Sequence, residues 1–135
     1  MITRSDVVNK AREYLGTKYA HQGRLKGVGI DCAGLLLCVG KELEIVPQDF
    51  EFVSYNRMND GRELKRIVEI FADETTDPHY ADICIINVMG NPQHCGFLSD
   101  KGMIHVLDSA VEHRIDEKWS KRIVATYKLK DVIDG

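Results

Sequence analysis

The sequence has no apolar run near the length of about 18 residues needed to cross a bilayer, no internal repeat and no low-complexity tract. Lys and Arg are scattered along the chain and the net charge is −3 at pH 7, which argues against a surface for nucleic acid or anionic membranes. The 135 residues are enough for one domain. We therefore predict one soluble domain, residues 1–135, whose partners include neither nucleic acid nor membrane.

The sequence also lacks the Cys-x-x-Cys spacing of structural zinc sites, and no apolar signal-peptide segment follows residues 1–6. We expect synthesis in the cytoplasm, where thiols stay reduced. The prediction is therefore four free thiols and no metal or other cofactor. Three of these thiols are expected to be core residues, namely Cys38, Cys84 and Cys95.

Hydrophobic periodicity divides the chain into helices followed by strands. Helical spacing occurs in residues 7–15, after a start at residues 3–6, and in residues 64–71, after a capping box of Asp60 and Glu63. Residues 32–39 are almost wholly apolar and indicate a buried helix. A period of two then predicts strands at Ala81–Val88, Gln93–Leu98, Met103–Leu107, Val111–Ile115 and Arg122–Leu129. This order predicts an α+β fold, with N-terminal helices packed on one side of a C-terminal antiparallel meander.

Two segments between these elements are predicted to be irregular. Residues 16–30 contain four glycines among polar residues, too many for a regular element. A loop of this length inside a compact domain is often functional. Residues 49–59 are expected to form an irregular linker or a short extended piece.

Cys32 follows the glycine-rich loop and begins the apolar helix. Unpaired N–H groups and the positive dipole end of a helix stabilise a thiolate and lower the thiol pKa. Free cysteines are more often small buried hydrophobes, and a cysteine nucleophile also needs a base and a group that orients the base. The helix start alone therefore does not identify Cys32 as a catalyst.

Two of the five histidines lie inside neighbouring predicted strands. If residues 99–102 form a hairpin loop, Gly96 pairs with His105, and His94 with Leu107. His94 and His105 then share a face as diagonal neighbours, about 7–8 Å apart, and Gly96 leaves room for one ring to lean towards the other. A shift of one residue would place them on opposite faces. The other three histidines, namely His21, His79 and His113, are expected to be structural or exposed. Of these, His113 is expected to point to solvent.

Three short segments, 31–35 (Asp-Cys-Ala-Gly-Leu), 94–98 (His-Cys-Gly-Phe-Leu) and 104–106 (Ile-His-Val), resemble in this order the NlpC-like cysteine peptidases, a papain-like family of bacterial cell-wall endopeptidases. The likeness extends to residues 14–19 and 81–83 and so covers most of residues 5–107. Residues 21–24 and 29–32 most resemble the branch found in phage tails and gene transfer agents. Many members have proline in place of Lys18 and serine in place of Ala33, which bears on substrate preference rather than on the catalytic groups.

The resemblance implies a papain-like NlpC-type fold without a cofactor, in which Cys32 is the nucleophile. His94 is then the base, and His105 is the polar residue that holds the His94 ring. Tyr19 would help to bind substrate or the oxyanion, together with the backbone N–H of Cys32. Gln22, whose amide can donate, and Asp31 are further candidates for substrate or oxyanion contacts.

The resemblance also implies a substrate, a peptidoglycan stem peptide, and a bond, the γ-D-glutamyl-diaminopimelate amide that the family usually cleaves. Phage-tail proteins are further expected partners. Without a signal peptide, the protein would reach the cell wall in a phage-like tail or by release at lysis. Two other function classes stay open: a non-catalytic tail component that binds the wall, and a thioester-forming amidase or acyltransferase acting on another amide.

Overall fold

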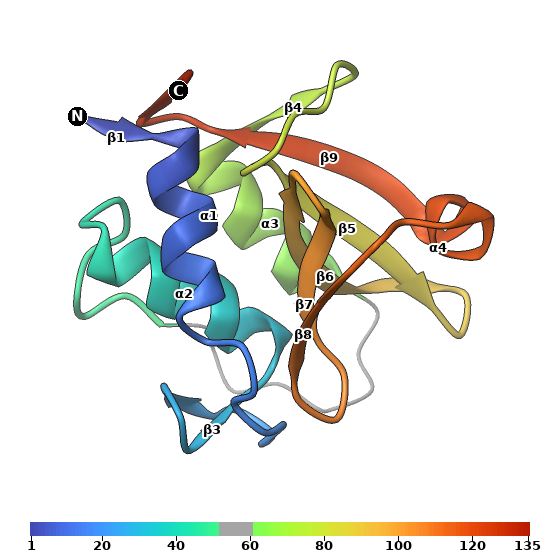
Figure 1. Cartoon of the computed structure of the whole chain (residues 1–135), viewed down its shortest axis with the longest axis horizontal. Coiled ribbons are helices and arrows are strands. Elements are labelled where there is room, and N and C mark those ends of the chain that lie inside the picture. The colour runs from blue at the N-terminus through green and yellow to red at the C-terminus, as the bar shows by residue number, and fades with distance from the viewer. Residues whose placement is uncertain (52–60) are drawn as a thin grey trace.

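The computed structural model describes residues 1–51 and 61–135 (Figure 1). The predicted linker at residues 49–59 falls largely outside these ranges, and the predicted N-cap Asp60 falls outside them entirely. Among the helices in the described ranges, none is both long enough and apolar enough to cross a membrane.

The helices in the described ranges are α1 (Arg4–Arg12), α2 (Cys32–Glu42), α3 (Arg62–Phe71) and α4 (Glu117–Arg122). Helix α1 starts at the predicted place, because the Thr3 hydroxyl accepts from the Asp6 N–H while the Asp6 carboxylate accepts from the Thr3 N–H. Helix α3 has Gly61 as its N-cap, in a left-handed backbone conformation with φ of 84°. Helix α4 was not predicted.

A six-stranded sheet has the strand order β4-β9-β5-β6-β7-β8, and every neighbouring pair in it is antiparallel. The predicted meander is confirmed for β5 to β8, but it is wrong for β9, which lies between β4 and β5. The place of β9 was not predictable, because strand order depends on packing across the whole sheet rather than on local periodicity. Strand β4 was not predicted either. The strands are β4 (Ala72–Thr75), β5 (Ile83–Val88), β6 (Asn91–Ser99), β7 (Gly102–Val106), β8 (Ala110–His113) and β9 (Ile123–Leu129).

Two smaller strand pairs lie outside this sheet. Strands β2 (Arg24–Leu25) and β3 (Gly29–Ile30) pair antiparallel, so the prediction that residues 16–30 contain no regular element is wrong. Strands β1 (Ile2–Thr3) and β10 (Val132–Ile133) pair parallel and bring the two ends of the chain together, as Figure 1 shows.

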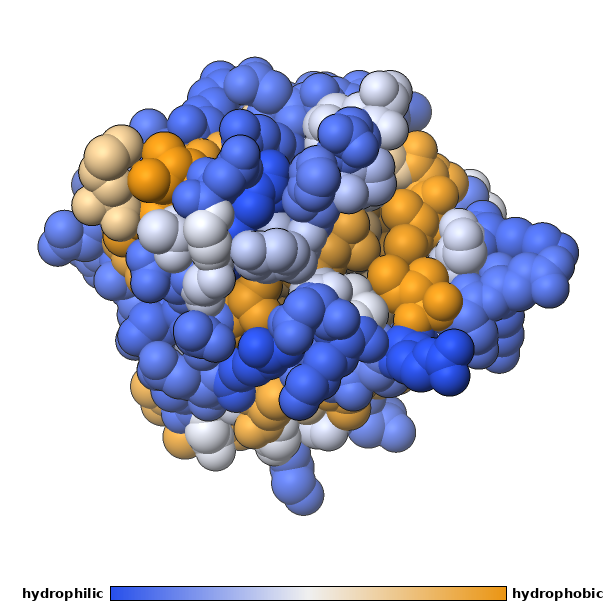
Figure 2. All heavy atoms as spheres, turned by 45° about the horizontal axis from the view of Figure 1, so that its top comes forward, coloured by the Kyte–Doolittle hydropathy of each residue, from blue (hydrophilic) through white to orange (hydrophobic). Residues whose placement is uncertain are grey.

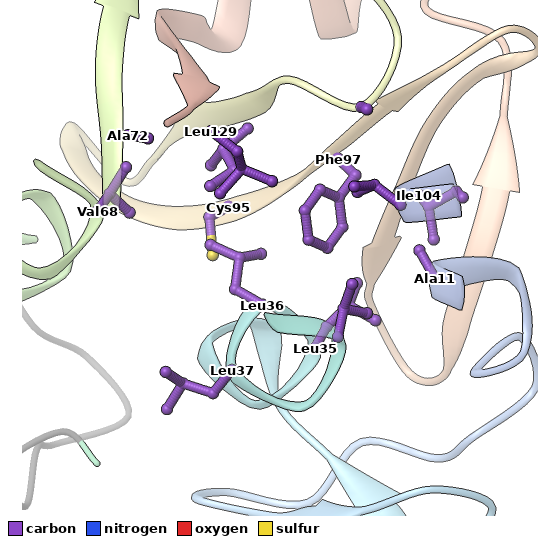
Figure 3. Close-up of a cluster of buried hydrophobic side chains, with 14 of the residues drawn as sticks. Ala11, Leu35, Leu36, Leu37, Val68, Ala72, Cys95, Phe97, Ile104 and Leu129 are labelled. Atoms are coloured by element: carbon purple, nitrogen blue, oxygen red, sulfur yellow. The ribbon is translucent and has the colours of Figure 1, made fainter. Parts of the chain in front are cut away.

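The main core lies between the sheet and helices α1, α2 and α3. Figure 3 shows leucine side chains of α2 next to Cys95 and Phe97 of β6, both of which are buried. The opposite face of the sheet carries a second cluster of Cys84, Ile86 and Met103, against which Trp119 of α4 packs. The predicted α+β arrangement of helices on one side of an antiparallel sheet is confirmed for α1, α2 and α3, whereas α4 contacts the other face.

The surface is mostly polar on the face that Figure 2 displays. Hydrophilic side chains cover most of this face, and apolar atoms show between them, in part within a hollow. The chemistry-bearing residues described next come from α2, from the segment before it, and from the neighbouring strands β6, β7 and β8.

Candidate active site

Cys32 is the first residue of α2, and Asp31 is the N-cap of this helix. The Gly34 N–H donates to one Asp31 carboxylate oxygen at 2.8 Å. The predicted helix start is therefore confirmed. It places the Cys32 thiol at the positive end of the helix dipole.

The Asp31 carboxylate also holds the preceding loop against α2. Its oxygens accept from the main-chain N–H of Gln22 at 2.8 Å and from the Arg24 guanidinium at 2.9 Å. Gly34 permits this close approach, because a Cβ atom there would lie 2.3 Å from the carbonyl oxygen of Gly23. Asp31 therefore positions the loop beside Cys32, and its contact with substrate stays a prediction.

Tyr19 and Gln22 both belong to the segment that leads into α2. The Tyr19 main chain donates to the Asp108 carbonyl at 2.9 Å and forms a bridge with Ile30, two residues before Cys32. Its side chain is half-buried and packs against the main core. Gln22 is exposed and has a left-handed backbone, with φ of 59°. The roles of both residues as substrate or oxyanion contacts stay predictions.

The histidine hairpin has the predicted register. Gly96 pairs with His105 and Leu98 with Met103, so His94 and His105 lie diagonally on one face. Their rings are hydrogen-bonded, with Nε2 of His94 2.8 Å from Nδ1 of His105. The space above Gly96 is needed for this contact, because a Cβ atom at that position would lie 2.8 Å from the Cβ of His105.

Cys32 contacts β6 beside His94. Its Sγ atom lies 4.0 Å from the carbonyl oxygen of Gln93, the residue before His94 on β6. Because Nε2 of His94 faces His105, Nδ1 is the ring nitrogen left for the thiol. Cys95 follows on the same strand, with its sulfur pointing toward α2 in Figure 3 and lying 3.5 Å from the Cys32 carbonyl oxygen. The structure thus brings Cys32, His94 and His105 together.

These contacts lower the pKa of Cys32 well below its ordinary value of 9.0. The hydrogen bond from the Cys95 thiol lowers this pKa most, burial opposes the shift, and the hydrogen bond and charge of His94 lower it further. The same pairing and burial raise the pKa of Cys95. Burial raises the pKa of Cys84 to about 12 and also raises that of Cys38. Cys32 is therefore the thiol that ionises most readily, as a nucleophile must.

His105 is fully buried, and its pKa is lowered to about 3 by burial and by the charges of His94 and His113. It therefore stays neutral at physiological pH and can accept a hydrogen bond from His94. The expectation that His113 points to solvent is wrong: its Nε2 atom lies 2.7 Å from Nε2 of His105. Trp119 of α4 covers this face of the sheet, and that cover could not be anticipated because α4 itself was not predicted.

The remaining histidine that can be placed by its contacts is His79, which is exposed and faces Asp77 at 3.2 Å, in line with the expected surface role. Across the described residues, no group of three or more His, Cys, Asp or Glu side chains is arranged to hold a metal ion. The rings of His94, His105 and His113 form a chain in which ring nitrogens face each other rather than a common point.

Comparison with solved structures shows which fold this is. The chain resembles the crystal structure of the NlpC/p60 domain of the peptidoglycan hydrolase SagA, with a TM-score of 0.66 and 15% sequence identity over 95% of this chain and 100% of that one. It also resembles a Staphylococcus aureus protein described as similar to a lipoprotein of the NLP/P60 family, with a TM-score of 0.64 and 14% identity over 93% of this chain and 41% of that one. The predicted NlpC-type fold is confirmed. No family model and no curated protein matches the sequence.

Proposed function

We propose that this chain is a cysteine peptidase that hydrolyses an amide bond in the stem peptide of peptidoglycan. One observation carries the proposal: Cys32, at the start of α2, contacts β6 beside His94, whose charge lowers the pKa of the thiol, and His94 is in turn hydrogen-bonded to His105. The nucleophile, the base and the group that orients the base are thus adjacent to one another in this order, as covalent catalysis by cysteine requires. The fold shared with a domain of a peptidoglycan hydrolase supports the choice of substrate.

In the proposed reaction, the Cys32 thiolate adds to the carbonyl carbon of the scissile amide. The Cys32 N–H at the helix start donates to the resulting oxyanion, and Tyr19 and Gln22 are proposed as further contacts. His94 gives the proton on Nδ1 to the leaving amine, which leaves an acyl thioester on Cys32. His94 then takes a proton from water as the water oxygen attacks the thioester, and the carboxylic acid product and free Cys32 result.

Within this function we assign the γ-D-glutamyl-diaminopimelate amide as the bond and a phage-like tail as the means of delivery to the cell wall. The bond rests on the resemblance to the family, and delivery by a tail rests on the resemblance of residues 21–24 and 29–32 to its phage-tail branch. Tail proteins would then be partners in addition to the stem peptide.

The test is incubation of purified muropeptides with the wild type, Cys32→Ala and Cys38→Ala, with products identified by mass spectrometry. Cys38 is a matched control because it lies on the same helix and its thiol contacts the Arg24 carbonyl. We expect cleavage by the wild type and Cys38→Ala, and none by Cys32→Ala. If no muropeptide is cleaved in a Cys32-dependent manner, the proposal is contradicted and a wall-binding tail component is favoured. Transfer of the acyl group to an added amine, in place of water, would favour an acyltransferase.

A further inference from the structure

A third histidine extends the pair formed by His94 and His105. Nε2 of His105 lies 2.7 Å from Nε2 of His113, and Nδ1 of His113 lies 2.7 Å from the main-chain carbonyl oxygen of Arg114. The three rings come from the neighbouring strands β6, β7 and β8. An unbroken row of hydrogen bonds therefore runs from the base beside Cys32 to a backbone carbonyl.

The carbonyl at the end of this row gives it a direction. A carbonyl oxygen only accepts, so Nδ1 of His113 must carry a proton. When His113 is neutral, its Nε2 atom is an acceptor, and Nε2 of His105 must donate to it. Nδ1 of His105 is then an acceptor for the N–H at Nε2 of His94. This leaves Nδ1 of His94 as the nitrogen that exchanges a proton with Cys32.

The neighbours of His113 hold its ring in this position. His113 pairs with the buried Met103 across β7 and β8. The Trp119 ring lies 5.2 Å from the ring centre of His113 and 4.9 Å from that of His105. Trp119 is fixed in turn at the start of α4, where its main-chain N–H donates to the N-cap carboxylate of Asp116 at 2.9 Å.

We propose that His113 is a positioning residue that selects the protonation pattern of His105 and thereby makes Nδ1 of His94 the base for Cys32. The proposal deepens the proposed function, since it takes Cys32 as the nucleophile. Without an acceptor at position 113, the buried N–H at Nε2 of His105 would have no partner, which is costly. His105 would then gain by moving this proton to Nδ1, where it would donate to His94. That arrangement removes the N–H at Nε2 of His94 and leaves Nδ1 protonated, so His94 could not accept the thiol proton.

Three variants test the proposal. His113→Phe keeps a ring against Trp119 but removes the acceptor, whereas the amide oxygen of His113→Gln can accept from His105. His79→Phe is the matched control on an exposed histidine outside the row. The measurements are the rate of Cys32 alkylation by iodoacetamide at pH 7 and the tautomer of His105 from ¹⁵N NMR shifts of the ring nitrogens. Neither measurement needs a substrate, so their outcome is independent of whether peptidoglycan is cleaved.

We expect His105 to be protonated at Nε2 in the wild type. His113→Phe should move the proton to Nδ1 and slow alkylation about tenfold, the equivalent of one unit in thiol pKa. His113→Gln should restore most of the rate, and His79→Phe should match the wild type. The proposal is overturned if the wild type carries the His105 proton on Nδ1, if His113→Phe alkylates at the wild-type rate, or if both His113 variants slow alkylation equally. The wild-type spectrum alone decides the first point, even if a variant does not fold.

Discussion

The rings of His94 and His105 meet through one specific pair of atoms, Nε2 of His94 and Nδ1 of His105, which lie 2.8 Å apart. This contact occupies Nε2 of His94 and leaves Nδ1 to exchange a proton with Cys32. It also places a ring that is neutral at physiological pH behind the base, because burial lowers the pKa of His105 to about 3. His94 can thus become positively charged next to the thiolate while keeping a hydrogen-bond acceptor on its far side.

The first prediction concerns the reactivity of the four thiols. Because the pKa of Cys32 is lowered and those of the other three are raised, iodoacetamide should modify Cys32 first at pH 7. His94→Ala should slow this modification about tenfold or more, since it removes one hydrogen bond and one charge that stabilise the thiolate. Peptide mapping by mass spectrometry after timed alkylation measures both effects. Equal labelling of all four thiols in the folded protein would contradict the prediction.

The second prediction concerns stability at acidic pH. The lowered pKa of His105 means that the unfolded chain takes up a proton near pH 6.5, while the folded protein does so only near pH 3. The free energy of unfolding should therefore fall as the pH drops through this range, by at most about 1.4 kcal/mol per pH unit. His105→Gln should lack this contribution.

Urea titrations of the wild type and His105→Gln at several pH values test this, because contributions of carboxylates cancel in the difference between the two proteins. The advantage of the wild type over the variant should shrink on acidification from pH 6.5 to 4. A difference that stays constant over this range would show that His105 is not the neutral group described above.

The third prediction concerns Gly96. An added methyl group would lie 2.6 Å from the Ile104 carbonyl oxygen and 2.8 Å from the Cβ of His105. Gly96→Ala should therefore displace His105, destabilise the protein by about 1–3 kcal/mol and slow Cys32 alkylation. Gly40→Ala is the matched control, since its methyl group would meet the side chain of Val46, remote from the histidines. Unchanged alkylation in Gly96→Ala would count against the tight fit of the two rings.

The fourth prediction concerns the N-cap of α2. Asp31→Ala should cost about 1–2 kcal/mol of stability, since it removes the bond from the Gly34 N–H. Asp31→Ser should recover part of this loss, because a hydroxyl can cap the helix but cannot pair with Arg24. Thr3→Ala removes the cap of α1 and should leave Cys32 alkylation unchanged. Thermal or urea unfolding, read together with alkylation rates, separates loss of a cap from loss of the site. Equal stability of the Asp31→Ala and Asp31→Ser variants would contradict the capping role.

The parts of the site that the sequence predicts are those that local chemistry determines. Asp31 and the apolar run after Cys32 mark a helix start, and the turn at residues 99–102 determines that Gly96 faces His105. The turn is tight, because Ser99 itself pairs with Gly102, yet the register is the predicted one.

The parts that the sequence does not predict depend on contacts between distant segments. Strand β9 is recognisable from its alternation, but its place between β4 and β5 is a property of the whole sheet. The location of His113 depends on α4, a helix of six residues that is too short to show a clear period. In the sequence, His113 alternates in step with the apolar Val111 and Ile115, and this pattern was the available sign that the position is covered.

The position of Trp119 has a practical consequence. It is the single tryptophan of the chain, and its ring lies against both His105 and His113. Indole emission is quenched more strongly by a charged imidazole ring than by a neutral one. The intrinsic fluorescence of the unlabelled protein should therefore fall as the buried His105 takes up a proton at acidic pH.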